Sequence, residues 1–330
     1  MSKVIFVTGA TGLVGANICR IGAARGYRMR ALVRPSNDVA PLRQLGVEIA
    51  YGDIADRASL ERAVEGANWV INCAALIGGT WATATPAEYD AVNQNGAFNV
   101  MDAAAKAGVE RTVMLLTTAF LQTDKTLTEL SPLIEMGPND PPYSRTKRAT
   151  YYEAMARAAR GQDIALVLPA AIYGPSPYVD RSLVPTSFNS NILCGINGTF
   201  KRYLPMQMTW VFVDDVANIA LAALERGRRG ARYLAAGAVD DNKSMPEFCA
   251  LAAEMAGSPH RVEAFNPNAP GAETDEEFGT MLRFANRVYP KPMQDPSRTI
   301  AELGVTPTSV ADGLRATVDW LEAEGRIQFA

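Results

Sequence analysis

Short apolar runs alternate with amphipathic stretches through the first half of the chain. The runs are rich in β-branched and aromatic residues, which is typical of buried strands, and the stretches between them are spaced as in helices. Glycines follow several of these stretches, where helices commonly end. The pattern predicts strands at 4–7, 29–33, 47–51, 69–73, 111–116 and 164–168, and helices at 13–24, 41–45, 59–64, 88–107 and 143–160.

This alternation predicts an α/β fold of the Rossmann type, a doubly wound parallel sheet with helices on both faces. The pattern loosens after Gly174, returns in a helix at 213–226, and ends in a surface helix at 312–324. We therefore predict a nucleotide-binding domain and a smaller C-terminal substrate-binding lobe. The domain comprises 1–174 plus 209–237, and the lobe comprises 175–208 and 238–330.

Composition excludes several classes of function. The 330 residues are 48% hydrophobic and 20% charged with a net charge of −3, so no broad basic field invites nucleic acid. The longest apolar runs are far too short to span a membrane. The chain starts directly with a strand pattern and shows no signal-peptide cleavage site, so we expect a cytoplasmic protein.

Cysteine and histidine offer little chemistry. The cysteines at 19, 73, 194 and 249 are widely separated and form no C-x-x-C pair, so we interpret them as small buried residues. His260 is the only histidine. A Ser-His-Asp relay or a multi-histidine zinc site would depend on that one residue, and we predict no metal.

The strongest local motif is the glycine-rich segment 8–15, TGATGLVG, between a predicted strand and a predicted helix. There Gly9 permits a tight turn, Gly12 lets the backbone approach a pyrophosphate, and Gly15 allows the helix to pack closely on the strand. The helix N-terminus then faces the phosphates. An ordinary turn is the alternative. We expect dinucleotide contacts from Gly9, Thr11, Gly12, Leu13 and Val14.

The second strand indicates which dinucleotide. An acidic residue at its end would accept the ribose 2′-hydroxyl of NAD, but this chain has Arg34 there, followed by Pro35 and Ser36. A guanidinium can hold a 2′-phosphate with two charge-assisted bonds, and Ser36 can add a hydroxyl donor. A solvated surface arginine is the alternative. We predict NADP(H), with NAD(H) less favoured.

Further cofactor contacts are expected where the next strands end. Asp53, with Ile54, could bind the adenine, although a plain turn aspartate is the competing interpretation. The small Ala74 and Ala75 leave room for a flat cofactor.

The chemistry of the reaction points to a tyrosine and a lysine. Tyr143 and Lys147 lie four apart in a predicted helix and therefore share one face. A nearby ammonium lowers the pKa of a phenol, which can then exchange a proton with a substrate oxygen. Thr117, which we expect to contact the cofactor, and Thr118 follow the fifth strand. A hydroxyl here, expected from Thr118, could polarise a carbonyl. A surface Tyr/Lys pair and a backbone-bonded threonine are the alternatives.

These residues together resemble the extended short-chain dehydrogenase/reductase family, of the NAD-dependent epimerase/dehydratase type. The resemblance covers nearly the whole chain, and its motifs are each modest but specific in their order. Besides the glycine loop and the Tyr/Lys pair, they are Gly52-Asp53, Ala74-Ala75, Asn93, Pro169, 173–175 and 213–217.

The resemblance implies roles for individual residues. Tyr143 would be the acid/base, Lys147 would also bind the nicotinamide ribose, and Thr118 would occupy a position where serine is usual. The loop from Pro169 to Ile172 would line the nicotinamide. Within the family the chain looks most like the dihydroflavonol-4-reductase-like branch, on the segments 33–35 and 210–215. Bacterial proteins called hopanoid-associated sugar epimerases are also similar.

Three reactions compete. Sugar dehydratases of this family carry an acidic pair after the catalytic threonine, and Ala119-Phe120 stand there instead. Sugar epimerases usually hold NAD with an acidic ligand, which Arg34 disfavours. An NADPH-dependent reductase of an aromatic, flavonoid-like or alicyclic ketone remains, acting on a small molecule and expected in a homodimer. A redox sensor would usually lack the Tyr/Lys pair. Substrate contacts are expected from the apolar candidates Phe120, Tyr178, Phe188 and Met206.

Overall fold

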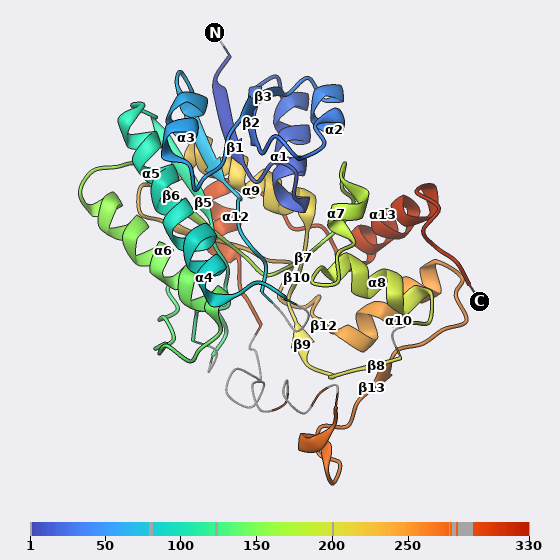
Figure 1. Cartoon of the computed structure of the whole chain (residues 1–330). Coiled ribbons are helices and arrows are strands. Elements are labelled where there is room, and N and C mark those ends of the chain that lie inside the picture. Colours follow the sequence, from blue (N-terminus) through green and yellow to red (C-terminus); the bar gives the residue numbers. More distant parts are fainter. Residues whose placement is uncertain are drawn as a thin grey trace.

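The computed structural model describes residues 2–78, 82–122, 125–199, 201–276, 278, 282 and 293–329. A seven-stranded parallel sheet with the order β11-β6-β5-β4-β1-β2-β3 forms its centre (Figure 1). The predicted doubly wound α/β fold is confirmed; β11 is absent from the prediction. The strands are β1 Val4–Thr8, β2 Arg28–Val33, β3 Glu48–Tyr51, β4 Trp69–Asn72, β5 Arg111–Leu115, β6 Ile164–Pro169 and β11 Arg232–Ala235.

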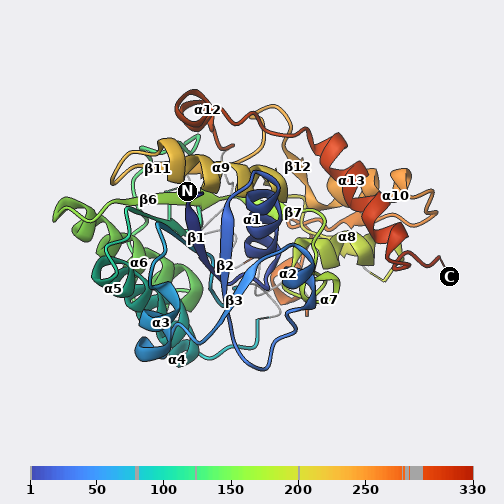
Figure 2. The same cartoon turned by 90° about the horizontal axis from the view of Figure 1, so that it is seen from above.

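Helices cover both faces of the sheet, as Figure 2 shows from above. One face carries α1 (Leu13–Ala24) and α9 (Val213–Arg226), which contact each other, with α12 (Ser297–Leu303) packed on α9. The other face carries α3 (Arg57–Val64), α5 (Ala97–Lys106) and α6 (Pro142–Ala159). The short α2 (Ala40–Gln44) lies beside β3. The strand order reverses between β1 and β4, where ligands of such sheets bind.

The long helix predicted at 88–107 is not regular. It consists of α4 (Pro86–Tyr89), the π-helix η1 (Asp90–Gly96) and α5. A capping box between Thr85 and Glu88 starts the helix before the predicted position. π-helices are rare, but those that occur inside longer helices often lie at functional sites. Asn93, at the centre of η1, is therefore a candidate functional residue.

The rest of the chain builds a second, smaller core beside the sheet. Within it Trp210 stacks on Phe248 with ring centroids 3.7 Å apart, and Tyr173 meets Phe248 edge to face. Its helices are α7 Val179–Ser182, α8 Phe188–Ile196, α10 Met245–Met255, η2 Ala272–Thr274 and α13 Val310–Ala323, and its strand pairs are β7 Ala171–Tyr173 with β10 Trp210–Phe212, β8 Arg202–Tyr203 with β13 Glu263–Ala264, and β9 Gln207–Met208 with β12 Lys243–Ser244.

Two features of this part differ from the prediction. The helices α8 and α10 are absent from it, because α8 contains Asn, Ser and Gly and α10 contains Pro246 in its first turn, and these residues favour turns. The final helix α13 is not simply a surface helix, since it buries Leu314, Val318 and Leu321 against α10. Part of the stretch predicted to be mixed, 283–292, lies outside the described residues.

Over the described ranges, no helix combines the length and apolarity needed to cross a bilayer. The same ranges contain no group of three or more His, Cys, Asp or Glu side chains placed to hold a metal ion.

Candidate active site

The glycine loop connects β1 to α1 at the carboxyl edge of the sheet. Gly9 has a φ of 68°, and a Cβ on it would lie 2.6 Å from the amide nitrogen of Ala74. A Cβ on Gly15 would lie 2.3 Å from the Gly9 carbonyl oxygen. Gly12 begins α1 with no side-chain cap and no acidic residue in the first turn. The first N–H groups of α1 therefore remain available to an anion, and the loop fits a dinucleotide pyrophosphate.

The other predicted residues of the loop lie around this helix start. Thr11 is buried, and its hydroxyl accepts a hydrogen bond from Asn37 Nδ2 at 3.4 Å. Leu13 and Val14 are half-buried in the first turn. Asn17, one turn later, donates to the Leu13 carbonyl and to the Pro175 carbonyl. The second bond ties α1 to the segment that follows β7.

Arg34 and Ser36 are exposed in the turn after β2. The turn is closed by a bond from the Asn37 amide to the Arg34 carbonyl at 2.9 Å. Asp38, the first acidic residue after β2, uses its carboxylate to accept from the Ala40 amide at the start of α2. From the other side, Arg181 of α7 donates to Asn37 Oδ1 at 3.3 Å. Asn37 and Arg181 are not among the residues predicted from the sequence, because no local pattern marks them.

The residues predicted after β3 are engaged with the protein. The Asp53 carboxylate accepts from the Ala55 amide at 2.9 Å, as in an ordinary turn. Ile54 is buried, and a Cβ on Gly96 of η1 would lie 2.6 Å from its side chain. The role of both residues at the adenine stays a prediction.

Asn93, at the centre of η1, holds the loop that follows β4. Its side chain donates to the Leu76 carbonyl at 2.9 Å and accepts from the Leu76 amide at 2.7 Å. Its own carbonyl accepts from the Thr150 hydroxyl of α6 at 2.9 Å. The loop includes the half-buried Ala74 and Ala75. The π-helix therefore joins this loop to the helix that carries the predicted catalytic pair.

Tyr143 and Lys147 lie on the inner side of α6. A Cβ on Gly78 would come within 2.7 Å of Tyr143 Cβ, so the loop after β4 packs directly on the tyrosine. The Lys147 ammonium is buried and donates to the Leu115 carbonyl at the end of β5, at 3.0 Å. Both groups thus face the carboxyl edge of the sheet near the switch point.

The electrostatics of this pair differ from the expectation. Burial raises the pKa of Tyr143, while a hydrogen bond to the Thr117 hydroxyl opposes that rise. Burial also lowers the pKa of Lys147 to about 8. The pKa of Tyr143 is therefore raised overall and not lowered as expected, because the loss of water around the phenol outweighs the other influences.

The two threonines after β5 have different partners. The Thr117 hydroxyl contacts Tyr143 and also accepts from the Ala119 amide at 3.1 Å. Thr118 is buried, its amide donates to the Pro169 carbonyl, and its hydroxyl accepts from Gln294 Nε2 at 3.2 Å. The structure thus brings Thr117 to the phenol and couples Thr118 to Gln294, a residue absent from the sequence analysis.

The predicted substrate residues have separate surroundings. Phe120 is fully buried against Tyr151. Tyr178 is buried, and its hydroxyl donates to the Asp38 carbonyl at 2.9 Å, so it joins α7 to the loop before α2. In contrast, Phe188 and Met206 are half-buried in the second core. The Ile172 side chain, in β7, is half-buried as well.

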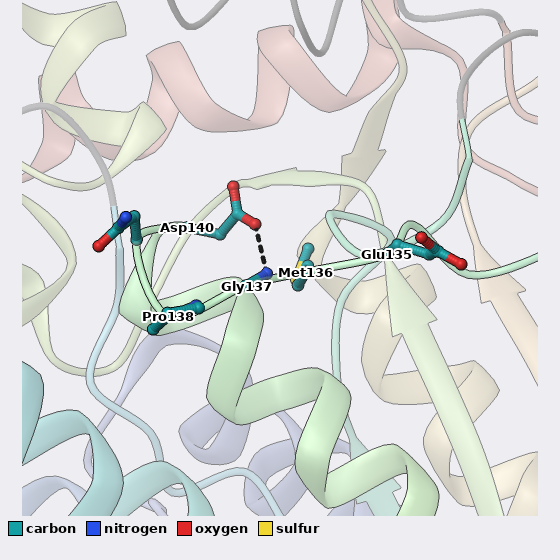
Figure 3. A pocket seen from close by; sticks show the side chains of 6 residues that line it. Glu135, Met136, Gly137, Pro138 and Asp140 are labelled. Carbon is teal, nitrogen blue, oxygen red and sulfur yellow. Dashed lines mark hydrogen bonds between the residues drawn. The ribbon is translucent and has the colours of Figure 1, made fainter.

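The hollow in Figure 3 lies in the loop before α6 and is lined by residues 135–140. The Gly137 amide donates to the Asp140 carboxylate at 2.8 Å across it. None of its lining residues is among the predicted site residues. The hollow is a feature of a short turn, and the candidate site is defined by the side chains around Tyr143.

Known proteins resemble the chain over most of its length. The profile described as Epimerase, NAD dependent epimerase/dehydratase family, matches residues 5–236. The Sterol demethylase protein B of Methylococcus capsulatus is 31% identical, over 97% of this chain and 99% of that protein. A Synechocystis protein named "Putative dihydroflavonol 4-reductase" is 28% identical, over 99% of this chain and 97% of its own length. The crystal structure of gox2253 is 27% identical with a TM-score of 0.83, covering 99% of this chain and 100% of that chain.

Proposed function

Because the chain belongs to the NAD dependent epimerase/dehydratase family, whose members are NAD(P)-dependent enzymes, we propose that it is an NADPH-dependent reductase of a ketone. The predicted family is confirmed. The proposal rests on one observation above all: α6 carries Tyr143, which lies beside Thr117, and the buried Lys147, which bonds the Leu115 carbonyl at the carboxyl end of β5. Such a group can move a proton to a carbonyl oxygen.

A dinucleotide fits the residues at this edge. The uncapped start of α1 and the three glycines offer N–H groups and room for a pyrophosphate. The dinucleotide, when bound, supplies the hydride. Lys147 would bind its nicotinamide ribose, and Pro169 and Ile172 would border the nicotinamide. A homodimer remains part of the proposal.

The protein's own residues divide the proton chemistry between them. Tyr143 donates the proton to the substrate oxygen. Thr117 lies beside the phenol and opposes the rise in its pKa. Thr118 keeps its proton and orients the same substrate oxygen by donating a hydrogen bond to it, because the bond from Gln294 already occupies a lone pair of Thr118 Oγ1 and leaves the hydroxyl hydrogen free. Lys147 keeps an ammonium beside the end of β5, where a proton can be passed on.

The preference for NADPH is supported by the charges after β2. Arg34 is exposed at the strand end, and Arg181 reaches the same turn through Asn37. The carboxylate of Asp38, which could have bound a ribose hydroxyl, accepts a hydrogen bond from the Ala40 amide instead. Two guanidinium groups favour a 2′-phosphate over a hydroxyl.

For the substrate we retain Phe188 and Met206, because their side chains are half-buried at the edge of the second core. We leave out Phe120 and Tyr178, since the first is enclosed in the core and the second is bonded to Asp38. The aromatic and aliphatic character of this region supports an apolar ketone.

The test follows the absorbance of NADPH with a panel of aromatic ketones, flavonoids, steroids and nucleotide sugars. Net oxidation of NADPH by at least one ketone is the expected result. Interconversion of a nucleotide sugar without net change in the cofactor would contradict the proposal and identify an epimerase.

Replacing the tyrosine is the sharper test. We expect Tyr143→Phe to lower kcat for ketone reduction by about 10²–10⁴-fold, which is the usual size of a lost acid–base group. Binding of NADPH, measured by fluorescence, should persist because the glycine loop is untouched. Tyr152→Phe, on the exposed side of the same helix, is the matched control. Substantial activity in Tyr143→Phe would remove the assignment.

A further inference from the structure

Gln294 enters the site from a distant part of the chain. It is 5% exposed and lies 176 residues away from its partner Thr118 in sequence. Its backbone is fixed on both sides, since the Leu127 amide donates to the Met293 carbonyl and the Asp295 amide donates to the Leu127 carbonyl, at 2.9 and 2.8 Å. The side chain therefore projects from a held segment.

The same segment is secured a second time. Glu129 is buried, and its carboxylate accepts bonds from the amide and the hydroxyl of Thr299, at the start of α12. Residues on both sides of Gln294 are thus anchored to the loop that follows β5. This anchoring limits how far the side chain can move away from Thr118.

Only one of the two polar atoms of the Gln294 side-chain amide forms a hydrogen bond within the described residues. Its Nε2 donates to the Thr118 hydroxyl at 3.2 Å, whereas its Oε1 is buried and has no hydrogen-bond partner among the described residues. A buried acceptor without a partner costs about 1–3 kcal/mol, and such groups in folded proteins call for an explanation. Because this one adjoins a hydroxyl of the reaction site, a substrate group can supply the missing partner.

We propose that Gln294 is a specificity-determining residue that positions Thr118 and accepts a hydrogen bond from a hydroxyl or N–H group next to the reacting carbonyl of the substrate. This inference rests on the proposed reductase function and adds the substrate class, which is a ketone with a hydrogen-bond donor on the adjacent carbon. A ketone without the donor leaves Oε1 unpaired in the bound state and is disfavoured.

The test compares two ketones that differ by one hydroxyl group, benzoin and deoxybenzoin, the first as separate enantiomers. The unmodified enzyme should show kcat/KM for the better benzoin enantiomer about 10-fold or more above that for deoxybenzoin, since about 1.4 kcal/mol corresponds to tenfold. Gln294→Met keeps the shape of the side chain and removes both polar atoms. In this variant the preference should fall to within about threefold.

Two further variants separate recognition from structure. Gln294→Glu retains an acceptor, so it should keep the preference for benzoin even if kcat falls for both ketones. Gln162→Met removes a glutamine that bonds the Met101 carbonyl beyond the end of α6, and it should leave the ratio unchanged. Unfolding temperature and NADPH affinity are measured for every variant, and the ratio of the two ketones is independent of the amount of folded enzyme.

The outcomes distinguish this inference from the function on which it rests. An unmodified enzyme that does not favour benzoin, or that reduces neither ketone, overturns the inference. If the ratio of kcat/KM for benzoin to that for deoxybenzoin is equal in Gln294→Met and in the unmodified enzyme, the inference is overturned as well. The proposed function survives in that case if Tyr143→Phe is inactive in the same assay. Activity in Tyr143→Phe means that the proposed function itself has failed.

Discussion

At the scale of single residues, the buried ammonium of Lys147 sets a pH limit. Burial lowers its pKa to about 8, so the group is charged below that pH and neutral above it. If the ammonium is needed to bind the cofactor and pass on a proton, kcat/KM for NADPH should fall as pH rises through about 8. This parameter reports the free enzyme, which the structure represents.

The matched variant for this prediction is Lys147→Arg. A guanidinium stays protonated throughout, so the alkaline fall should move to higher pH even if the absolute activity is lower. The measurement is the pH dependence of kcat/KM for NADPH at constant ionic strength. A fall at the same pH in both proteins would show that another group titrates.

Single residues also show where sequence reasoning ends. The spacing of Tyr143 and Lys147 places both on one face of a helix, because the helical period alone dictates it. Their pKa values could not be predicted, since these depend on how much water the fold removes around each group. The contact of Gln294 with Thr118 joins segments far apart in sequence. No local pattern encodes such a contact.

At the scale of elements, predictability follows amphipathic regularity. The bounds of α1 and α9 are those expected, because each has a clear apolar stripe and a local stop signal. The π-helix η1 and the short β11 were not predicted. A π-helix could not be distinguished from an α-helix, because the apolar positions recur with the same period in the sequence. The strand β11 has only four residues, and its packing on β6 and α9 stabilises it.

The packing of the element α1 on the glycine loop gives a prediction of its own. A Cβ at position 15 would lie 2.3 Å from the Gly9 carbonyl oxygen, and backbone must shift to admit it. We expect Gly15→Ala to lower the free energy of unfolding by about 1–3 kcal/mol and to weaken NADPH binding. Chemical denaturation and cofactor titration measure the two effects.

The control for this substitution is Gly137→Ala. A Cβ there meets nothing within 4 Å, and its φ is not in the left-handed region. Its stability and cofactor affinity should therefore match those of the unmodified protein. If Gly15→Ala behaved as this control does, the close approach of α1 to the loop would not matter for binding.

At the scale of the whole molecule, the segment that follows β7 joins the second core to the sheet edge that carries the glycine loop. The Asn17 side chain donates a hydrogen bond to the Pro175 carbonyl, and the Tyr178 hydroxyl donates one to the Asp38 carbonyl. The Arg181 guanidinium donates to Asn37 Oδ1. These three bonds attach the segment to α1 and to the loop before α2. A ligand bound at the turn that carries Arg34 should therefore stabilise both parts of the molecule together.

This arrangement predicts that NADPH protects the protein from unfolding more than NADH does. A ligand at 100 times its Kd adds about 2.7 kcal/mol to the stability, so at equal concentration the tighter dinucleotide gives the larger rise in Tm. Arg34→Ala should remove most of the difference between the two cofactors, and Arg181→Ala should reduce it, because each loses one cation for the 2′-phosphate.

The control is Arg229→Ala, which removes an exposed arginine bonded to the Gly161 carbonyl and should keep the full difference. Equal shifts with NADPH and NADH in the unmodified protein would contradict the roles given to Arg34 and Arg181. A difference that persists in Arg181→Ala would assign the preference to Arg34 alone and detach α7 from cofactor selection.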